Sequence, residues 1–569
     1  MNTPVAKFNV SDYTQVASTP GGMVVYVSGV TRRGPVNDPS QIIDTYEKFR
    51  RIFGDEASES LFSELDPQAS KFTTFVKRML RYGARLRINR VVHTAIEGEA
   101  ATASAKAPYT KDVYLNFYKK VKGEDAEGNE KVEKELERMA KAFTATIKYP
   151  GADYNGIHLV IKPASNGNKK AFDMDIVWPA NPDYSESYQN IAYPNPSLSA
   201  SEQTYLDSVS KLSQLVDFEY VDIKDAFAPD EDGNEFEPDW DNAQIEIMAN
   251  LTQKLFIKDS PFSGGSNGGA VTKSDFLKAT QAFDQYQDGP VLLAVPGIYD
   301  VDIQNAFASY AVSRQDMVYM GSLHITSTDQ INNAIEDRNL IAGDTPYVVI
   351  TCGGIKILDP NTNKKICISE IADVIGLIVT TYNNRGAWFD PASRQSASIL
   401  DAIGVEFNFG TPALSKSLND LANHGINPVI SDNGILEWKS SYTCQLTDSA
   451  MSFLSVVMLT LYMRATMLPV LKSHLKEPCD IVTFKAMYRQ FKTFLDNLAN
   501  TQNRALWKYE YMGDQDASSL DDLTVNRKED VQIGKYKAFL KVWVIVPLVD
   551  ATLNMMLVMG DGEVGIEIE

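Results

Sequence analysis

The sequence predicts a multidomain protein of mixed α/β and α+β class. Three observations lead to this prediction. The chain has 569 residues, which is more than one hydrophobic core can hold. Residues 271–399 alternate between helix-like and strand-like runs, which is typical of an α/β layer with parallel strands. Residues 94–270 instead combine short alternating strand runs with acidic, charged stretches, which indicates a β-rich insertion with exposed loops.

The first part of the chain predicts a compact strand–helix–helix–strand unit that ends near residue 93. Residues 23–30 are an apolar run typical of a buried strand, and a helical pattern follows at 46–53. A second helical pattern at 72–83 leads into an alternating strand run at 84–92.

From residue 271 onward, helices and strands follow each other at spacings that favour parallel pairing. The predicted elements are a helix at 272–286, a buried strand at 289–297, a helix at 301–315, and strands at 318–325 and 346–354.

The final section, residues 400–548, predicts two strong helices and then an apolar strand run at 537–549. In the helix after Pro478, apolar residues recur with the helical period and predict a core face. This face consists of Phe484, Met487, Phe491, Phe494, Leu495 and Leu498. Lys485, Arg489 and Lys492 form a separate basic stripe, which is either a solvated helix face or a docking surface.

Both ends of the chain carry short apolar alternations outside any predicted domain. Val564, Ile566 and Ile568 share one face of a terminal strand pattern, with acidic residues and a glycine on the other face. The first ten residues contain a similar set, Val5, Phe8 and Val10. Termini usually fray unless something holds them. We therefore expect strands that are donated to neighbouring subunits, as in a polymer-forming protein.

Composition excludes several classes of protein. A net charge of −20 argues against a protein that mainly coats nucleic acid. The four cysteines form no CxxC pair, so a disulfide framework is not expected. The most apolar run, residues 451–463, is shorter than a membrane span and stops at Arg464, so we expect a core helix and no stable membrane insertion. The first residues have no signal-peptide pattern.

Several motifs, taken in order, resemble those of one protein family. They are GVTRRGPVNDP at 29–39, RYGARLRINRVV at 81–92, KYPGADYNGIHLVI at 148–161, SGGSNGGAVTKSDF at 263–276, VLLAVPGIYD at 291–300, NNRGAWFDPA at 383–392 and LNDLANHGINPVI at 418–430. In this order they resemble the contractile tail sheath proteins of bacteriophages and related contractile injection systems. The segment 94–145 carries no motif of the family.

The resemblance implies a structural protein without a cofactor. Such subunits form stacked six-fold rings around an inner tail tube, join baseplate and tail terminator proteins at the ends, and exchange terminal strands with neighbours. It also implies a virion tail protein made in the host cytoplasm, without direct contact to nucleic acid. The basic stripe would then face an acidic tube.

The domains expected from the resemblance follow the chain. They are an N-terminal arm at 1–20, the first part of a conserved sheath core at 21–93, the β-rich insertion at 94–270, a subtilisin-like α/β domain at 271–399, the C-terminal part of the core at 400–548, and a C-terminal strand arm at 549–569.

Other readings of single motifs are weaker. Ser266 lies in a formal GxSxG pattern, but no strand precedes it directly, so a glycine loop is favoured over a nucleophile. The same loop lacks the lysine of a phosphate-binding loop. The acidic turn at 229–241 has the wrong spacing for calcium, and His474 with Cys479 lacks a second ligand pair. A hydrolase, a generic shell or adhesin, and the sheath of a bacteriocin or cell-encoded injection system remain alternatives.

Overall fold

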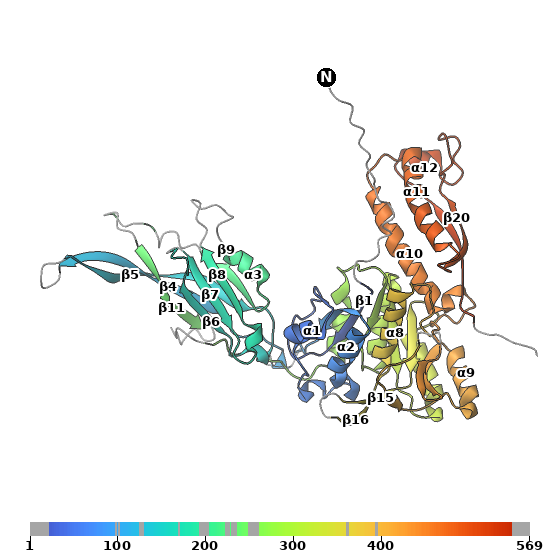
Figure 1. Cartoon of the computed structure of the whole chain (residues 1–569), viewed down its shortest axis with the longest axis horizontal. Helices are drawn as coiled ribbons and strands as arrows, with labels where there is room; N and C mark the ends of the chain where they lie inside the picture. Colours follow the sequence, from blue (N-terminus) through green and yellow to red (C-terminus); the bar gives the residue numbers. More distant parts are fainter. Residues whose placement is uncertain are drawn as a thin grey trace, which may run out of the picture.

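A computed structural model describes residues 22–548, apart from 97–98, 101–102, 125–129, 169–170, 193–203, 222–227, 229–230, 232–235, 248–260, 360–362 and 393–396. The described chain forms three parts (Figure 1). We call them the α/β layer (residues 22–92 and 271–444), the β-sandwich (residues 105–247) and the C-terminal subdomain (residues 454–548). The predicted arms at 1–20 and 549–569 lie outside the described residues, as does most of the acidic turn at 229–241.

The α/β layer is built on one eight-stranded sheet with the order β19-β18-β14-β13-β12-β1-β3-β2. Neighbouring strands from β3 to β18 are parallel, and β2 and β19 are antiparallel at the edges. The strands are β1 Val24–Gly29, β2 Ile42–Ile43, β3 Arg85–Arg90, β12 Val291–Ala294, β13 Met317–Leu323, β14 Val348–Cys352, β18 Ile426–Asp432 and β19 Ile435–Trp438. Every residue of β1, β12, β13 and β14 is buried, as expected for parallel strands covered on both faces.

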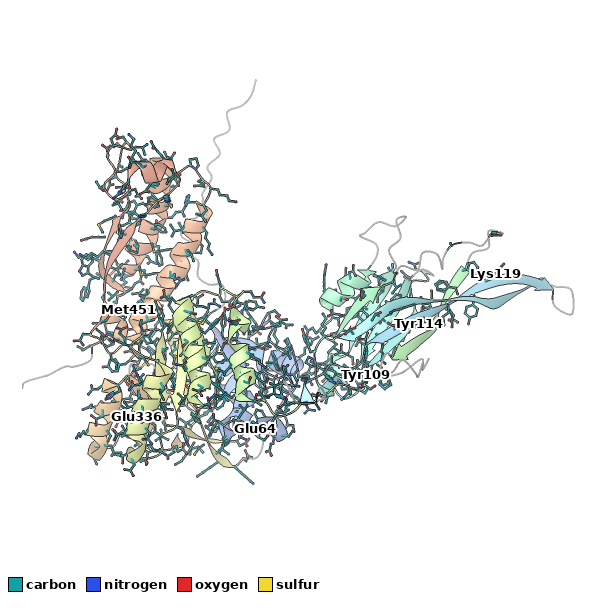
Figure 2. The ribbon with its side chains drawn as sticks, turned by 180° about the vertical axis from the view of Figure 1, so that it is seen from behind. Glu64, Tyr109, Tyr114, Lys119, Glu336 and Met451 are labelled. Carbon is teal, nitrogen blue, oxygen red and sulfur yellow. The ribbon has the colours of Figure 1, made fainter. Side chains whose placement is uncertain are left out.

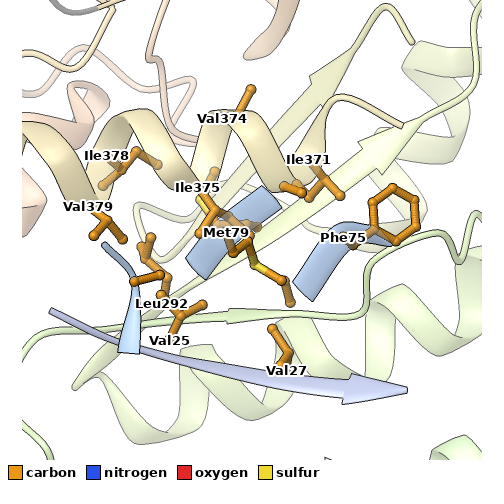
Figure 3. Packing of buried hydrophobic residues seen from close by; sticks show 14 of the residues in the cluster. Val25, Val27, Phe75, Met79, Leu292, Ile371, Val374, Ile375, Ile378 and Val379 are labelled. Carbon is orange, nitrogen blue, oxygen red and sulfur yellow. The ribbon is translucent and has the colours of Figure 1, made fainter. Parts of the chain in front are cut away.

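Helices cover both faces of this sheet. One face packs against α1 Tyr46–Phe53, α2 Phe72–Arg81 and α8 Ile371–Asn384. The other face packs against α5 Lys273–Lys278, α6 Val301–Arg314, α7 Ile331–Ile341 and α9 Ser415–Asn423. Figure 3 shows Phe75 and Met79 of α2 and Ile375 of α8 above Val25 and Val27 of β1. Val24 and Tyr26 point to the opposite cluster, because side chains alternate along a strand.

The sheet crosses the domain boundaries that the sequence suggested. Strands from 21–93, from 271–399 and from 400–548 lie in the same sheet, and β1 pairs on one side with β3 and on the other with β12. The reason is that a fully buried central strand needs a partner on each edge, and after the insertion the chain returns beside β1. A small sheet of β15 Ile355–Leu358, β16 Lys365–Ile368 and β17 Gly404–Val405 flanks the layer.

The β-sandwich consists of two four-stranded sheets, β10-β5-β4-β11 and β6-β7-β8-β9, around one hydrophobic cluster. Its elements are β4 Lys111–Glu124, β5 Glu130–Ile147, β6 His158–Pro163, β7 Ala171–Val177, β8 Glu186–Ala192, β9 Thr204–Tyr205, α3 Leu206–Leu212, β10 Val216–Tyr220 and β11 Phe236–Ile247.

The sequence indicated no element for the charged block at 123–141. Its described residues, 123–124 and 130–141, belong to the long β4–β5 hairpin, which projects beyond the sandwich (Figure 1). Main-chain pairing between the two strands outweighs the weak strand propensity of charged residues.

The C-terminal subdomain packs two helices against a two-stranded sheet. Its elements are α10 Leu454–Ser473, α11 Ile481–Leu498, β20 Leu506–Met512, α12 Lys528–Gln532 and β21 Phe539–Val544. The predicted core face of α11 is confirmed, because all six of its residues are buried in one cluster.

Helix α10 continues past Arg464, where the apolar run of the sequence ends. The exposed Arg464 side chain donates to the main-chain oxygen of Gln315, so its charge does not interrupt the helix. By length and composition α10 is the one helix among the described residues that could cross a membrane. Its first half is buried in hydrophobic clusters, and 44% of its apolar window is buried in the protein. Burial of this kind is what a core helix requires.

Candidate assembly surfaces

The β20–β21 hairpin leaves both of its edges open. The two strands pair antiparallel with each other, and within the described chain they have no further strand neighbour. Each strand therefore presents one outer row of main-chain N–H and C=O groups, except that the oxygen of Tyr511 accepts from Gln515. An open edge of this kind is a template for another strand.

The inner face of the hairpin is anchored and the outer face is exposed. Leu506 and Tyr511 are buried against α10 and α11. On the outer face Trp507 is 73% exposed. The Lys508 ammonium lies 3.8 Å from the ring centre of Trp543 on the neighbouring strand. The hairpin is thus firmly supported on one side while its edges and outer face remain available for contacts.

One carboxylate fixes the long connection between β20 and β21. Asp514 accepts from the main-chain N–H groups of Thr524, Val525 and Asn526 at 2.7, 3.0 and 2.8 Å. These hydrogen bonds hold the pKa of Asp514 well below its usual range, although burial of the carboxyl opposes them. Residues 524–526 of the connection are therefore held beside the end of β20.

Both described ends of the chain lie near the junction of this subdomain with the α/β layer. The main-chain N–H of Met23 donates to Asn383 Oδ1 at the end of α8, at 3.0 Å. At the other end, residues 545–548 line a cavity of about 520 Å³ together with Arg385, Lys439 and Arg504. The predicted arm residues Val5, Phe8, Val10, Val564, Ile566 and Ile568 lie outside the described residues.

The basic stripe of α11 lies on the surface, opposite the core face. Arg489 and Lys492 are exposed, and Lys485 is half-buried. Lys492 pairs with Asp496 one turn later at 2.6 Å, which raises the pKa of its ammonium group. Lys485 and Arg489 have no carboxylate within ion-pair distance in the part of the chain that the structure describes. Two of the three predicted contact residues therefore carry charge that no described neighbour offsets.

The loop around Ser266 is a linker and not a nucleophile elbow. Its main chain pairs with that of Lys106, and Ser266 Oγ accepts from the N–H of Gly268 at 3.1 Å. The glycines allow close packing, since a Cβ at Gly264 would lie 2.1 Å from the ring of Tyr109. The ring nitrogens of buried His93, beside this loop, bond to carboxylates instead.

His474 and Cys479 have separate partners in the structure. Nδ1 of His474 contacts Glu477 Oε2 at 2.5 Å, while the thiol of Cys479 faces the main-chain oxygen of Lys535. Across the described ranges no group of three or more histidine, cysteine or acidic residues has an arrangement that could hold a metal ion.

Sequence reasoning missed the contacts between the α/β layer and the β-sandwich. Arg33 is buried against Trp178 and Asp153 of the sandwich. In the sequence it is one of two adjacent arginines in what reads as a polar turn. A local signal that could have pointed to this contact is the pair of adjacent arginines, Arg32 and Arg33, shortly after the buried strand β1.

No known family profile and no curated protein match the chain. Several solved structures do. A sheath tail protein from Desulfitobacterium hafniense is matched over 95% of this chain and 100% of that protein, with 10% identity and a TM-score of 0.45. The baseplate of the anti-feeding prophage is matched over 52% of this chain and 78% of that one, with 17% identity and a TM-score of 0.40.

The sheath complex of the extracellular contractile injection system PVC, in its contracted state, is matched over 51% of this chain and 77% of that one, with 15% identity and a TM-score of 0.41. Of these three structures, one is named as a sheath tail protein, one as a baseplate and one as the sheath complex of a contractile injection system. The motifs in the sequence resemble the same class of protein.

Proposed function

We propose that this protein is the structural subunit of a contractile sheath. It polymerises as stacked six-fold rings around an inner tube, and contraction drives the tube through a target cell envelope. The observation that carries the proposal is the anchored β20–β21 hairpin with two open edges, in a chain whose ends both alternate like strands. The ordered sequence motifs supply the remaining support.

Strand addition suits a polymer that must stay joined while its subunits move. A donated strand forms several main-chain hydrogen bonds, each of which contributes about 0.5–1.5 kcal/mol net. The register of the bonds makes the joint specific, while the linkers to the arms can bend. In our proposal Val564, Ile566 and Ile568 of one subunit and Val5, Phe8 and Val10 of another complete the hairpin of a third.

Contacts to the tube should be weaker and polar, because the sheath has to slide on it. Lys485, Arg489 and Lys492 would face acidic side chains of the tube protein. Charge pairs at an exposed interface give orientation and specificity more than affinity. Contraction is then a shift between two packings of the subunit, started at the baseplate and passed along the rings. Nothing in this scheme requires a nucleotide, and a tail terminator would close the far end.

The same scheme fits a phage tail, a bacteriocin or a cell-encoded injection system. For a phage, the subunit would be made in the host cytoplasm and reside in the virion tail. The hydrolase alternative predicts that Ser266→Ala abolishes an activity, whereas a linker loop predicts no change. A shell or adhesin would assemble without an inner tube, so co-purification of a tube protein separates it from a sheath.

Electron microscopy of the purified protein at high concentration tests the proposal. The full chain should form regular hollow tubes, and a chain truncated before Glu563 should not. The matched control replaces Glu567 and Glu569 by glutamine, which keeps the apolar face of the terminal strand and should keep the tubes. Tubes that persist after truncation, or monomers from every form even with the tube protein present, would count against strand-linked assembly.

A further inference from the structure

The β-sandwich is joined to the α/β layer by a neck in which two linkers lie side by side. Residues 103–109 lead out and 263–269 lead back, and Tyr109 marks this neck in Figure 2. Main-chain bonds of 2.8 and 2.9 Å connect Lys106 and Ser266 in both directions. The linkers therefore support each other, but they extend along one line and do not by themselves fix a rotation.

Arg33 of the α/β layer reaches across this neck and is 3% exposed. Its guanidinium carbon lies 4.5 Å from the ring centre of Trp178 in the β-sandwich. Nη1 lies 3.3 Å from Asp153 Oδ2 of the sandwich, and Nη2 donates to the main-chain oxygen of Arg50 at 2.9 Å. One planar cation thus bonds to both parts at once and stacks on a buried indole.

Arg90, at the end of β3, makes a second buried connection. Nη1 donates to the oxygen of Gly34 at 2.9 Å and to that of Pro150, at the root of the β-sandwich, at 2.6 Å. The N–H of Gly34 in turn donates to the hydroxyl of Tyr154 at 3.0 Å. Burial lowers the pKa of Arg90 to about 10, so the group remains charged at neutral pH.

These contacts lie at the carboxyl ends of β1 and β3. Open α/β sheets usually place their ligands outside the carboxyl ends of parallel strands. Here Arg33, four residues after β1, and Arg90, the last residue of β3, bind the chain's own inserted domain. Relative motion of two domains is the usual expectation when their interface is small and polar. Buried arginines with fixed partners oppose that motion.

We propose that Arg33 clamps the β-sandwich to the α/β layer, so that the two move as one body with a fixed orientation. The clamp occupies the position where such a sheet would otherwise bind a ligand. The inference does not depend on the sheath proposal, since it concerns a contact within one chain.

Distance measurement between two spin labels tests the clamp. Leu340 on α7 and Leu212 on α3 are 64% and 68% exposed, and cysteine at each position would carry a label. Cys367 and Cys479 would first be replaced by serine, because they are partly accessible. With Arg33 intact we expect one narrow distance distribution. Arg33→Ala should make its width about twice as large, because the contacts that remain, from Arg90 to Pro150 and from Gly34 to Tyr154, hold the sandwich only near its root.

Two further variants make the result specific. Arg32→Ala is the matched control, because Arg32 also contacts Asp153 but its side chain is 48% exposed and stacks on no ring of the sandwich among the described contacts. It should leave the distribution narrow. Arg33→Lys keeps the charge but loses the planar stack, so it should give an intermediate width. This variant also tests the clamp if the alanine variant does not fold. A broad distribution in the unaltered protein, an unchanged width in both Arg33 variants, or equal broadening by Arg32→Ala would overturn the proposal.

Discussion

At the scale of single residues, Lys111 in the β-sandwich is unusual because its amino group is buried. It is fully buried at the start of β4, and its ammonium lies 4.5 Å from the ring centre of Phe262. In the described chain no hydrogen-bond acceptor reaches it. Burial lowers its pKa from 10.5 to about 8, because a low-dielectric site disfavours the charged form.

This lowered pKa sets the sign of a pH effect. Between pH 8 and 10.5 the unfolded chain binds more protons at this lysine than the folded chain, so stability rises with pH across that window. Lys111→Met should remove this rise and stabilise the protein at pH 7 by about 1–3 kcal/mol, since attraction to the Phe262 ring offsets only part of the burial cost. Urea unfolding at pH 7 and pH 10 measures both effects.

The control for this prediction is Lys141→Met. Lys141 pairs with Asp112 at 2.7 Å, and the Asp112 side chain is only 6% exposed, so Lys141→Met should destabilise the protein because a buried carboxylate loses its cation. A Lys111→Met protein that is less stable than the unaltered one at pH 7 would contradict the prediction.

His93 predicts the opposite pH dependence. Its ring nitrogens lie 2.8 Å from Asp275 and 3.0 Å from Glu99, and the hydrogen bond to Asp275 is the main cause of its raised pKa. The charged form therefore contributes stability that is complete below about pH 6.5 and is lost as pH rises through the folded pKa. Asp275 and Glu99, with lowered pKa values, contribute stability that is lost only in acid.

Melting temperatures at pH 6 and pH 8.5 test this account. His93→Gln keeps a polar side chain but cannot be charged, so the variant should lose less stability than the unaltered protein between the two values. Lys111 titrates partly in the same range, and its effect cancels because both proteins contain it. An equal change in both proteins would show that His93 is not the group responsible.

At the scale of elements, α11 illustrates what a periodic pattern can and cannot predict. The period of its apolar residues defined the core face and therefore also which residues face outward. It could not predict that Asp496 offsets the charge of Lys492 but leaves Lys485 and Arg489 without a partner in the described region, because that depends on how exposed side chains bend.

Charge reversal on α11 tests the proposed contact with the tube. Lys485→Glu with Arg489→Glu should weaken co-sedimentation with the tube protein about tenfold and reduce the salt dependence of binding, because exposed charge pairs are screened by salt. The matched control is Lys535→Glu with Lys537→Glu, which changes the charge of the same subdomain by the same amount before β21. Equal weakening by the control would indicate a general charge effect, and unchanged binding by the α11 variant would exclude this face.

At the scale of the whole molecule, the sequence predicted those parts of the fold that depend on local patterns. The buried strands at 23–30 and 289–297 and the helix at 301–315 correspond to β1, β12 and α6, because their periodicity is strong. The β4–β5 hairpin was missed because its charged residues give no alternation of apolar positions. The pairing of β1 with β12 across the insertion was missed because strand partners depend on the packing of the whole sheet and not on local sequence. The buried contact of Arg33 was missed because arginines are rarely buried, and one in a polar stretch is expected to lie in an exposed turn.

The insertion should be removable without unfolding the rest of the chain. The chain enters and leaves the β-sandwich at neighbouring points, since the carboxylate of Asp275, after the insertion, accepts from the main-chain N–H of Thr94 at its start, at 3.1 Å. The strands of the eight-stranded sheet lie outside residues 94–270. A chain in which a short Gly-Ser linker replaces 96–268 should therefore fold its α/β layer and C-terminal subdomain.

Excision of the insertion also exposes Arg33 and Arg90. This exposure should not prevent folding, because water solvates both cations well. Residues 94–270 contain 30 acidic and 17 basic residues, so they carry most of the net charge of −20. Their removal lowers repulsion between neighbouring subunits, and tubes should form at lower salt than with the full chain. Circular dichroism and electron microscopy check folding and assembly separately. A folded variant that forms no tubes under any salt condition would show that the β-sandwich is itself part of the subunit contact.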